Sequence, residues 1–347
     1  MIALHETNLW ALLDGVAGTA RTAQLFEALT LDSRLLQPRH PEVTRGELAQ
    51  ALAMLLFENV TNAVPMARAY VRDAIREGRK LTFDHGALRT VAAASGMLPN
   101  GHLAFARILE PLGYQVAGVY PLDRLGMTGR AYAHVDLPES IAQYFVSELH
   151  PERFSPDFQA AVQRVVSSSH DPLPQRALDL LATLAQAGTL PLRSAIRLLP
   201  NLVACFARHH AEPNWNDYQL LLRESAEMAW IATEGNAFNH ATDRVADVAV
   251  VAEQQRRRGR PIKEALEVSG SGRVIQTAFR AAQVERLFVD ADGSLRSAMV
   301  PGSFHEFITR KEEAPGRLDL RFDSSNAQAI FRMTANGGDG AAVRASA

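Results

Sequence analysis

The chain has 347 residues, with 36 Lys and Arg against 38 Asp and Glu and a formal net charge of −2 at pH 7. This balance excludes a strongly basic surface for nucleic acid, and no apolar stretch has the roughly 20 residues needed to span a bilayer. The single cysteine, Cys205, excludes an internal disulfide framework and a zinc site built from several cysteines of one chain. The first residues lack the basic and apolar regions of a secretory signal. We therefore expect a cytoplasmic protein that binds neither nucleic acid nor membrane.

Apolar residues recur at helical spacing over about residues 7–78 and again over residues 155–234. The longest stripe includes Leu48, Leu52 and Leu55, a pattern typical of a helix packed on a core. Prolines interrupt the second region, which is nonetheless too apolar to be a disordered linker. Both regions are predicted to be helical.

Between and after these regions, short alternating runs predict strands mixed with helices. Strands are expected at residues 82–83, 114–120, 131–135, 235–240, 265–268, 274–282, 285–289, 306–310 and 318–322, with a hairpin turn at Gly293. Helices are expected at residues 102–112, 141–149, 243–258 and 326–331. Strands mixed with helices are thus expected in two separate regions, and two related α+β modules that face one another would explain this pattern.

One histidine in each strand-containing region is followed four residues later by an arginine. The pairs are His85 with Arg89 and His240 with Arg244. If the chain is helical after Gly86, His85 and Arg89 lie on one face. An imidazole and a guanidinium on one face suit a site that holds a metal and an anionic substrate together.

A carboxylate from a late strand, Glu306, could complete a set of two histidines and one acid. Such a set is the usual ligand group of non-haem Fe(II) enzymes, which leave positions open for substrate and oxygen. Glu306 is flanked by Phe304, Phe307 and Ile308, and glutamate is rarely buried unless it is paired or bound to metal. The plainer interpretations are a surface or hydrogen-bonded core histidine for His85 or His240 and an edge-strand glutamate that points into water.

Three segments, at residues 84–90, 239–244 and 304–308, resemble the signature blocks of the 2-oxoadipate dioxygenase/decarboxylase family. The resemblance extends over about residues 47–332 and includes residues 145–149. It implies an α+β fold of paired vicinal-oxygen-chelate, or glyoxalase-like, β modules around a central metal site. N-terminal helices and a large helical insertion are added to these modules in the family.

The resemblance also implies the chemistry and the residues that perform it. His85, His240 and Glu306 would ligate Fe(II), with O2 as the co-substrate. Arg89 would be catalytic through its contact with a substrate carboxylate, and Ser324 and Ser325 would also contact the substrate. Members of the family convert 2-oxoadipate to 2-hydroxyglutarate and CO2, a reaction associated with lysine catabolism.

The expected organisation is a single catalytic domain over residues 1–335, followed by a disordered tail at residues 336–347. The domain would consist of a helical N-terminal part at 1–80, a first α+β module at 81–150, a helical insertion at 151–234 and a second α+β module at 235–335. The sequence does not determine the oligomeric state.

Two other functions remain open at this stage. The same site could serve a Zn- or Ni-dependent lyase, isomerase or hydrolase of the glyoxalase type. The chain could instead be a non-enzymatic helical binding protein with a degenerate site. The roles of His134, His305 and Arg244 and the exact 2-oxo acid are also left open. The segment after Glu306 is shorter than in typical family members, so the resemblance supports the metal site better than the substrate.

Overall fold

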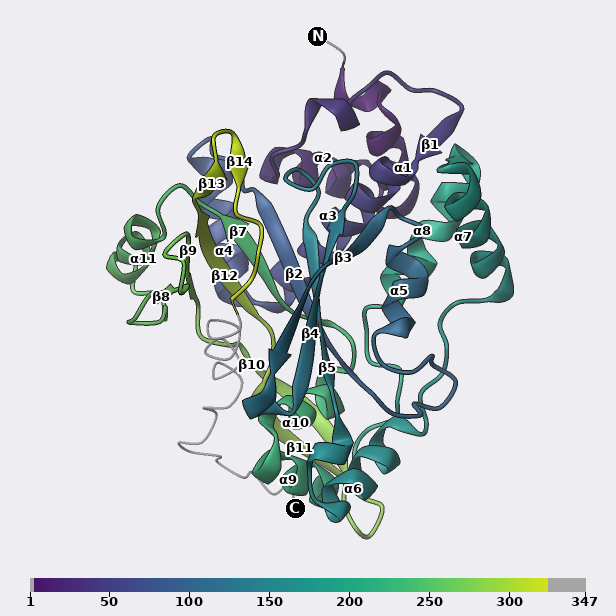
Figure 1. Ribbon diagram of the computed structural model, residues 1–347, viewed down its shortest axis with the longest axis vertical. Helices are drawn as coiled ribbons and strands as arrows, with labels where there is room; N and C mark the ends of the chain where they lie inside the picture. The colour runs from purple at the N-terminus through teal and green to yellow at the C-terminus, as the bar shows by residue number, and fades with distance from the viewer. Residues whose placement is uncertain (1–2, 324–347) are drawn as a thin grey trace.

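An eight-stranded sheet runs through the centre of the computed structural model, which describes residues 3–323 (Figure 1). The strand order is β3-β4-β5-β2-β7-β12-β9-β8. In chain order the strands are β2 (Phe83–Val91), β3 (Tyr114–Leu122), β4 (Met127–His134), β5 (Gln143–Leu149), β7 (Phe238–Arg244), β8 (Glu267–Val268), β9 (Val274–Ala278) and β12 (Phe304–Arg310). The protein is therefore α+β, as expected.

The two halves of the sheet repeat one pairing pattern on either side of a central antiparallel pair, β2 and β7. On one side β2 is parallel to β5, and β4 and β3 follow in antiparallel order. On the other side β7 is parallel to β12, and β9 and β8 follow in antiparallel order. The strands nearest the centre thus come from both strand-containing regions of the sequence.

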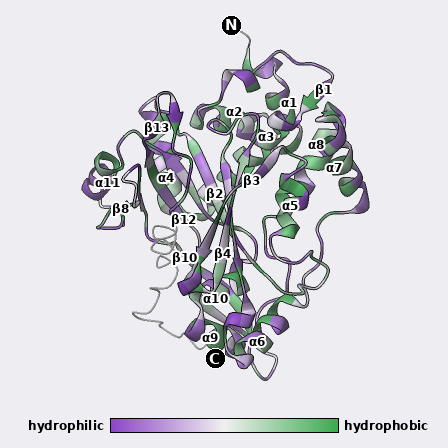
Figure 2. Cartoon of the chain, in the orientation of Figure 1, coloured by the Kyte–Doolittle hydropathy of each residue, from purple (hydrophilic) through white to green (hydrophobic). Residues whose placement is uncertain are grey.

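Helices cover the sheet, and several short strands lie outside it. The helices are α1 (Asn8–Ala17), α2 (Thr19–Ala28), α3 (Arg45–Ala63), α4 (Pro65–Arg76), α5 (Leu103–Leu109), α6 (Pro156–Val166), α7 (Gln175–Ala187), α8 (Leu192–Ala204), α9 (Trp215–Glu224), α10 (Ala226–Glu234) and α11 (Val248–Arg257). The strands outside the sheet form three pairs, namely β1 (Glu42–Thr44) with β6 (Thr189–Pro191), β10 (Gln283–Val289) with β11 (Leu295–Pro301), and β13 (Glu312–Ala314) with β14 (Arg317–Leu318). Figure 2 shows hydrophilic and hydrophobic residues on the same helices, as in α7 and α11.

The longest helix, α3, illustrates how the sequence determines a local boundary. The Thr44 hydroxyl accepts from the backbone N–H of Glu47, and the Glu47 carboxylate accepts in return from the Thr44 N–H. This capping box satisfies backbone donors that would otherwise lack partners. Most of the helix is buried against the sheet and its neighbours, which confirms the predicted apolar stripe.

Successive residues of β2 belong to two different hydrophobic clusters. Leu88 packs in a cluster with residues of α1–α5, whereas Ala87 and Val91 pack in a second cluster with residues of α6, α9 and α10. This alternation follows from the two-residue period of a strand. We call the side of the sheet that carries Ala87 the inner face. Figure 1 shows α6, α9, α10 and β11 grouped at the lower end of the sheet.

Several elements differ from the expectations. Residues 141–149 were predicted to be helical, but β5 occupies most of them. Every residue of β5 is buried, so polar and apolar residues do not alternate along it and the usual signal of a strand is missing. Strand β11 was not predicted. It pairs with β10 across the expected hairpin turn at Gly293, whose φ is +84°. The strand expected at 318–322 is limited to β14, which ends at Leu318.

Other expectations are not tested by the described residues. The helix predicted at 326–331 and the tail at 336–347 both lie outside residues 3–323. Among the described residues, no helix has both the length and the apolar character required to cross a membrane.

Candidate metal centre

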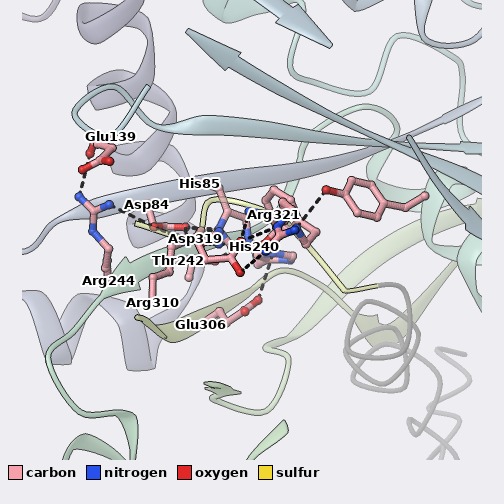
Figure 3. A network of polar contacts seen from close by, with 12 residues as sticks. Asp84, His85, Glu139, His240, Thr242, Arg244, Glu306, Arg310, Asp319 and Arg321 are labelled. Atoms are coloured by element: carbon pink, nitrogen blue, oxygen red, sulfur yellow. Dashed lines mark hydrogen bonds and ion pairs between the residues drawn. The ribbon is translucent and has the colours of Figure 1, made fainter. Parts of the chain in front are cut away.

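Three neighbouring strands bring together the two histidines and the glutamate selected from the sequence. His85 comes from β2, His240 from β7 and Glu306 from β12. One ligand atom of each side chain lies within 4.8 Å of the others, and all three residues are buried. Figure 3 shows the three side chains directed toward a common point. Residues far apart in the sequence therefore form one cluster on the inner face of the sheet.

The spacing of the ligand atoms suits a metal ion. His240 Nε2 lies 3.2 Å from Glu306 Oε2 and 3.4 Å from His85 Nε2. Ligands held about 2.1 Å from a metal, at right angles or at tetrahedral angles, are separated by roughly 3.0–3.4 Å. The two separations from His240 thus match those between adjacent ligands of one metal ion.

The polar atoms of the cluster also fit a cation. Glu306 is fully buried, and within residues 3–323 neither of its carboxylate oxygens has a hydrogen-bond partner. A buried carboxylate without compensation is costly. Burial raises the pKa of Glu306 well above its usual value and lowers the pKa values of His85 and His240. Two neutral imidazoles and one carboxylate are the donor set that a divalent transition metal binds.

Asp84 sets the orientation of the His85 ring. Its Oδ1 lies 2.9 Å from His85 Nδ1, so a proton on Nδ1 leaves Nε2 available to the cluster. Arg310 donates to both Asp84 oxygens over 2.9–3.0 Å. Burial by itself would raise the pKa of Asp84, but the charge of Arg310 and the hydrogen bond from His85 hold it below its usual value. Asp84 therefore remains an ionised acceptor for the His85 ring.

Arg89 lies on the same face of β2 as His85, although the reason differs from the one expected. The chain continues as a strand through Gly86 instead of becoming helical. Residues four apart share a face in a strand as well, because side chains alternate with a period of two. Gly86 has no side chain, and a Cβ atom at this position would lie 2.1 Å from the Phe238 ring. The Phe238 ring therefore fills the space that a side chain at position 86 would need.

The Arg89 guanidinium has an acidic and an aromatic neighbour on α10. Its Nη2 lies 2.7 Å from Glu227 Oε2, and its central carbon lies 4.8 Å from the centre of the Trp230 ring. Burial lowers the pKa of Arg89 and raises that of Glu227 to about 7, and each charge partly offsets the shift of the other. Glu227 was not among the residues selected from the sequence, because nothing near it in the sequence signals a partner on β2.

Arg244 does not repeat the position of Arg89 despite the shared spacing. One of its nitrogens donates to the Glu139 carbonyl oxygen, and another lies 3.8 Å from Asp84 Oδ2 (Figure 3). It therefore contributes positive charge beside Asp84, while Arg89 forms its pair with Glu227.

The remaining histidines of interest lie away from the cluster. His305 packs among the rings of Tyr70, Phe279 and Phe307. His134 accepts through Nδ1 from the backbone N–H groups of residues 136 and 137. Both therefore serve as core residues. The predicted substrate contacts of Ser324 and Ser325 lie outside the described residues and stay a prediction.

The chain is similar to proteins of one family along most of its length. A family model described as 2-oxoadipate dioxygenase/decarboxylase matches residues 47–330. A structure from Ralstonia eutropha JMP134, described as a glyoxalase superfamily protein, is 54% identical, with a TM-score of 0.88. The match covers 91% of this chain and 98% of that one. No curated protein sequence matches the chain significantly.

Two more distant structures share the fold. The hydroxyglutarate synthase from Oryza sativa in complex with 2-oxoadipate is 20% identical, with a TM-score of 0.64 and coverage of 86% of this chain and 97% of that one. The hydroxyglutarate synthase from Pseudomonas putida in complex with 2-oxoadipate is 19% identical, with a TM-score of 0.61 and coverage of 85% and 74%. These likenesses agree with the two-module sheet described above.

Proposed function

We propose that this chain, which belongs to the 2-oxoadipate dioxygenase/decarboxylase family, is an Fe(II)-dependent dioxygenase that decarboxylates a small 2-oxo acid. The observation that carries the proposal is the buried cluster of His85, His240 and Glu306 on three adjacent strands. Arg89, on the same face of the sheet, supplies a positive charge for an acid. 2-Oxoadipate, the acid for which the family is named, is the first substrate to test.

Each residue of the cluster has a defined task in this proposal. His85 and His240 offer Nε2 lone pairs, and Glu306 offers a carboxylate oxygen. Bound Fe(II) would supply Lewis acidity and a site for O2 next to the 2-oxo acid. The Asp84 carboxylate accepts a hydrogen bond from the Nδ1–H of His85. The His85 ring therefore keeps the same orientation when other ligands of the metal exchange.

Arg89 would hold the substrate in position. A guanidinium remains charged at physiological pH and presents several N–H donors in a fixed plane, which suits a carboxylate. The side chain is fully buried, so water competes weakly for it and the interaction is stronger than at a surface. Arg89 thereby fixes the distance between the acid and the cluster.

The proposed reaction needs no outside reductant. 2-Oxoadipate and O2 together contain the same atoms as 2-hydroxyglutarate and CO2, so the substrate itself provides the electrons that reduce O2. The carbon–carbon bond beside the keto group breaks, and the lost carboxylate leaves as CO2.

Oxygen consumption tests the proposal directly. The protein is loaded with Fe(II) without oxygen and then mixed with O2 and a series of 2-oxo acids that includes 2-oxoadipate. We expect O2 uptake and CO2 release in equal amounts for at least one acid, and neither for the His240→Ala variant. If no acid in the series supports O2 uptake, the dioxygenase proposal is wrong.

A glyoxalase-type reaction is the second candidate, because the 54% identical structure is described as a glyoxalase superfamily protein. A lyase, isomerase or hydrolase of this type would use Zn or Ni at the same cluster. Turnover of a substrate by the Zn- or Ni-loaded protein without O2 would favour this candidate over the dioxygenase.

A further inference from the structure

The Arg89–Glu227 ion pair is enclosed within the protein. The side chain of Arg89 is fully buried and that of Glu227 is 4% exposed. Glu227 lies in the first turn of α10, which packs against β2, and Trp230 from the same helix stacks on the Arg89 guanidinium. The proposed substrate anchor therefore already has a carboxylate as its neighbour.

The pair and the cluster are four residues apart on the same face of β2. Arg89 follows His85 by four residues, which corresponds to about 13 Å along an extended strand. A short 2-oxo acid held by its keto end at the cluster would direct its other end toward Arg89. The group at that end would consequently meet both Arg89 and Glu227.

Among the described residues around α10, Arg89 is the one whose charge shifts the pKa of Glu227. On α9, Asp217 pairs with Arg164 of α6, Glu224 accepts from Ser155, and Arg223 is exposed. Asp157 of α6 is exposed as well. Within residues 3–323, the pKa of Glu227 is therefore set by its burial and by the charge of Arg89.

A substrate carboxylate at this position would be a second negative charge beside the Arg89 guanidinium, which already pairs with the Glu227 carboxylate. Two carboxylates close together in a buried site repel, and one of them is favoured in its protonated form. An uncharged polar group carries no such cost. Ser147 faces Arg89 across the β2–β5 pairing, and its buried hydroxyl has no hydrogen-bond partner among residues 3–323. It can bond to a hydroxyl or amide.

We propose that Glu227 is a specificity-determining residue, which makes the site favour 2-oxo acids whose far end is polar and uncharged over those that carry a second carboxylate. The far end of the preferred substrate would donate to Glu227 and accept from Ser147 or Arg89. This inference rests on the proposed function only in that a 2-oxo acid binds at the cluster.

At acid pH the preference for an uncharged far end over a second carboxylate should become smaller. Burial raises the pKa of Glu227 to about 7, so Glu227 is mostly neutral below that pH and leaves the charge of Arg89 for a substrate carboxylate. Above it, Glu227 is ionised and competes. The dissociation constant of a dicarboxylate should therefore rise with pH through about 7, while that of an acid with an uncharged end should not rise.

Two matched ligands test the proposal, namely 2-oxoadipate and its 6-monoamide, which differ only in the charge at the far end. Dissociation constants are measured without oxygen on the Fe(II)-loaded protein, from tryptophan fluorescence or calorimetry. At pH 8 we expect the monoamide to bind at least tenfold more tightly than 2-oxoadipate. In Glu227→Gln the ratio of the two dissociation constants at pH 8 should be at least tenfold smaller than in the unaltered protein. From pH 6 to pH 8, 2-oxoadipate should bind about tenfold more weakly to the unaltered protein.

Glu234→Gln is the control variant. Glu234 also lies on α10 and also pairs with an arginine, Arg286 of β10, over 2.7 Å, and this change should leave the preference unaltered. The inference is wrong if Glu227→Gln leaves the ratio of the two dissociation constants unchanged. Should that variant fail to fold, the absence of a pH effect on 2-oxoadipate binding to the unaltered protein is equally decisive. Ligand binding as expected without O2 uptake would instead reject the dioxygenase reaction and keep the role of Glu227.

Discussion

His85 Nδ1 lies 2.9 Å from Oδ1 of Asp84, the residue directly before it in the chain. Neighbouring residues of a regular strand point to opposite faces, so such a contact requires an irregularity. The β2–β7 pairing contains one, because its register shifts between residues 83 and 85. Such bulges turn side chains near functional sites. Here the bulge allows the carboxylate and the imidazole to meet.

Asp84→Asn should weaken metal binding without removing a ligand. The amide is a poorer acceptor for the Nδ1 proton and lacks the charge that favours it, so the His85 ring loses its fixed orientation. Changes of this kind lower metal affinity by about 10–100-fold, which a competition titration with a metal chelator measures.

Glu148→Gln is the matched control for Asp84→Asn. Glu148 also accepts from a histidine Nδ1, that of His102, and from an arginine, Arg130, but it is not part of the cluster. Its replacement should leave the metal affinity unchanged. A metal affinity for Asp84→Asn equal to that of the unaltered protein would show that Asp84 does not orient His85.

Glu306→Gln should abolish stoichiometric binding of Fe(II). The variant keeps the size of the side chain but removes the charged ligand of a three-residue set, and the amide cannot replace it as an anionic donor. Metal analysis after dialysis measures the bound Fe(II), and His102→Gln serves as a histidine control away from the cluster. Full metal content in Glu306→Gln would place the metal elsewhere.

Arg310→Ala should destabilise the whole fold as well as the site. Arg310 is the buried partner of Asp84 and also donates to the carbonyl oxygens of Asp319 and Arg321. Removal of one partner from a buried ion pair costs about 3–5 kcal/mol. Denaturant unfolding of the metal-free protein measures this loss.

The exposed pair of Arg21 and Glu58 provides the comparison for Arg310→Ala. Arg21→Ala should change the free energy of unfolding by less than about 1 kcal/mol, because water and salt screen a surface pair. Equal effects of the two variants would contradict the structural role assigned to Arg310.

The stability of the metal-free protein should depend on pH through Asp243. Burial raises the pKa of Asp243 to about 7, although the Tyr70 hydroxyl and the Thr82 N–H both donate to it and oppose the shift. The folded state thus holds a proton that the unfolded state releases near pH 4. The resulting stabilisation is complete below about pH 4 and is lost as the pH rises through about 7.

Asp243→Asn removes this proton equilibrium. The free energy of unfolding of the unaltered protein should therefore fall relative to that of the variant between pH 4 and pH 7, by at most about 4 kcal/mol. Denaturant unfolding at a series of pH values measures the difference. Parallel pH curves for the two proteins would mean that Asp243 is ionised throughout the range.

The sequence by itself was sufficient to select His85, His240 and Glu306 as candidate ligands, because few residue types bind transition metals and each of the three stands in a block that resembles the family's. The structure brings these three candidates together. It also located most helices, since their apolar residues repeat with the period of a helix that is buried on one side. Strand β5 was mistaken for a helix because burial on both faces removes the alternation on which the prediction depends.

Only the tertiary structure decided which side chains surround the three candidate ligands. Arg310 meets Asp84 across 226 residues of sequence, and Glu227 meets Arg89 from a different helix. Such pairs carry no local signal, because they depend on strand register and on the packing of α10 against β2. The residues that supply the proposed chemistry were thus determined by local sequence. Their orientation, charge balance and proposed selectivity depend on long-range contacts that form only when the chain folds.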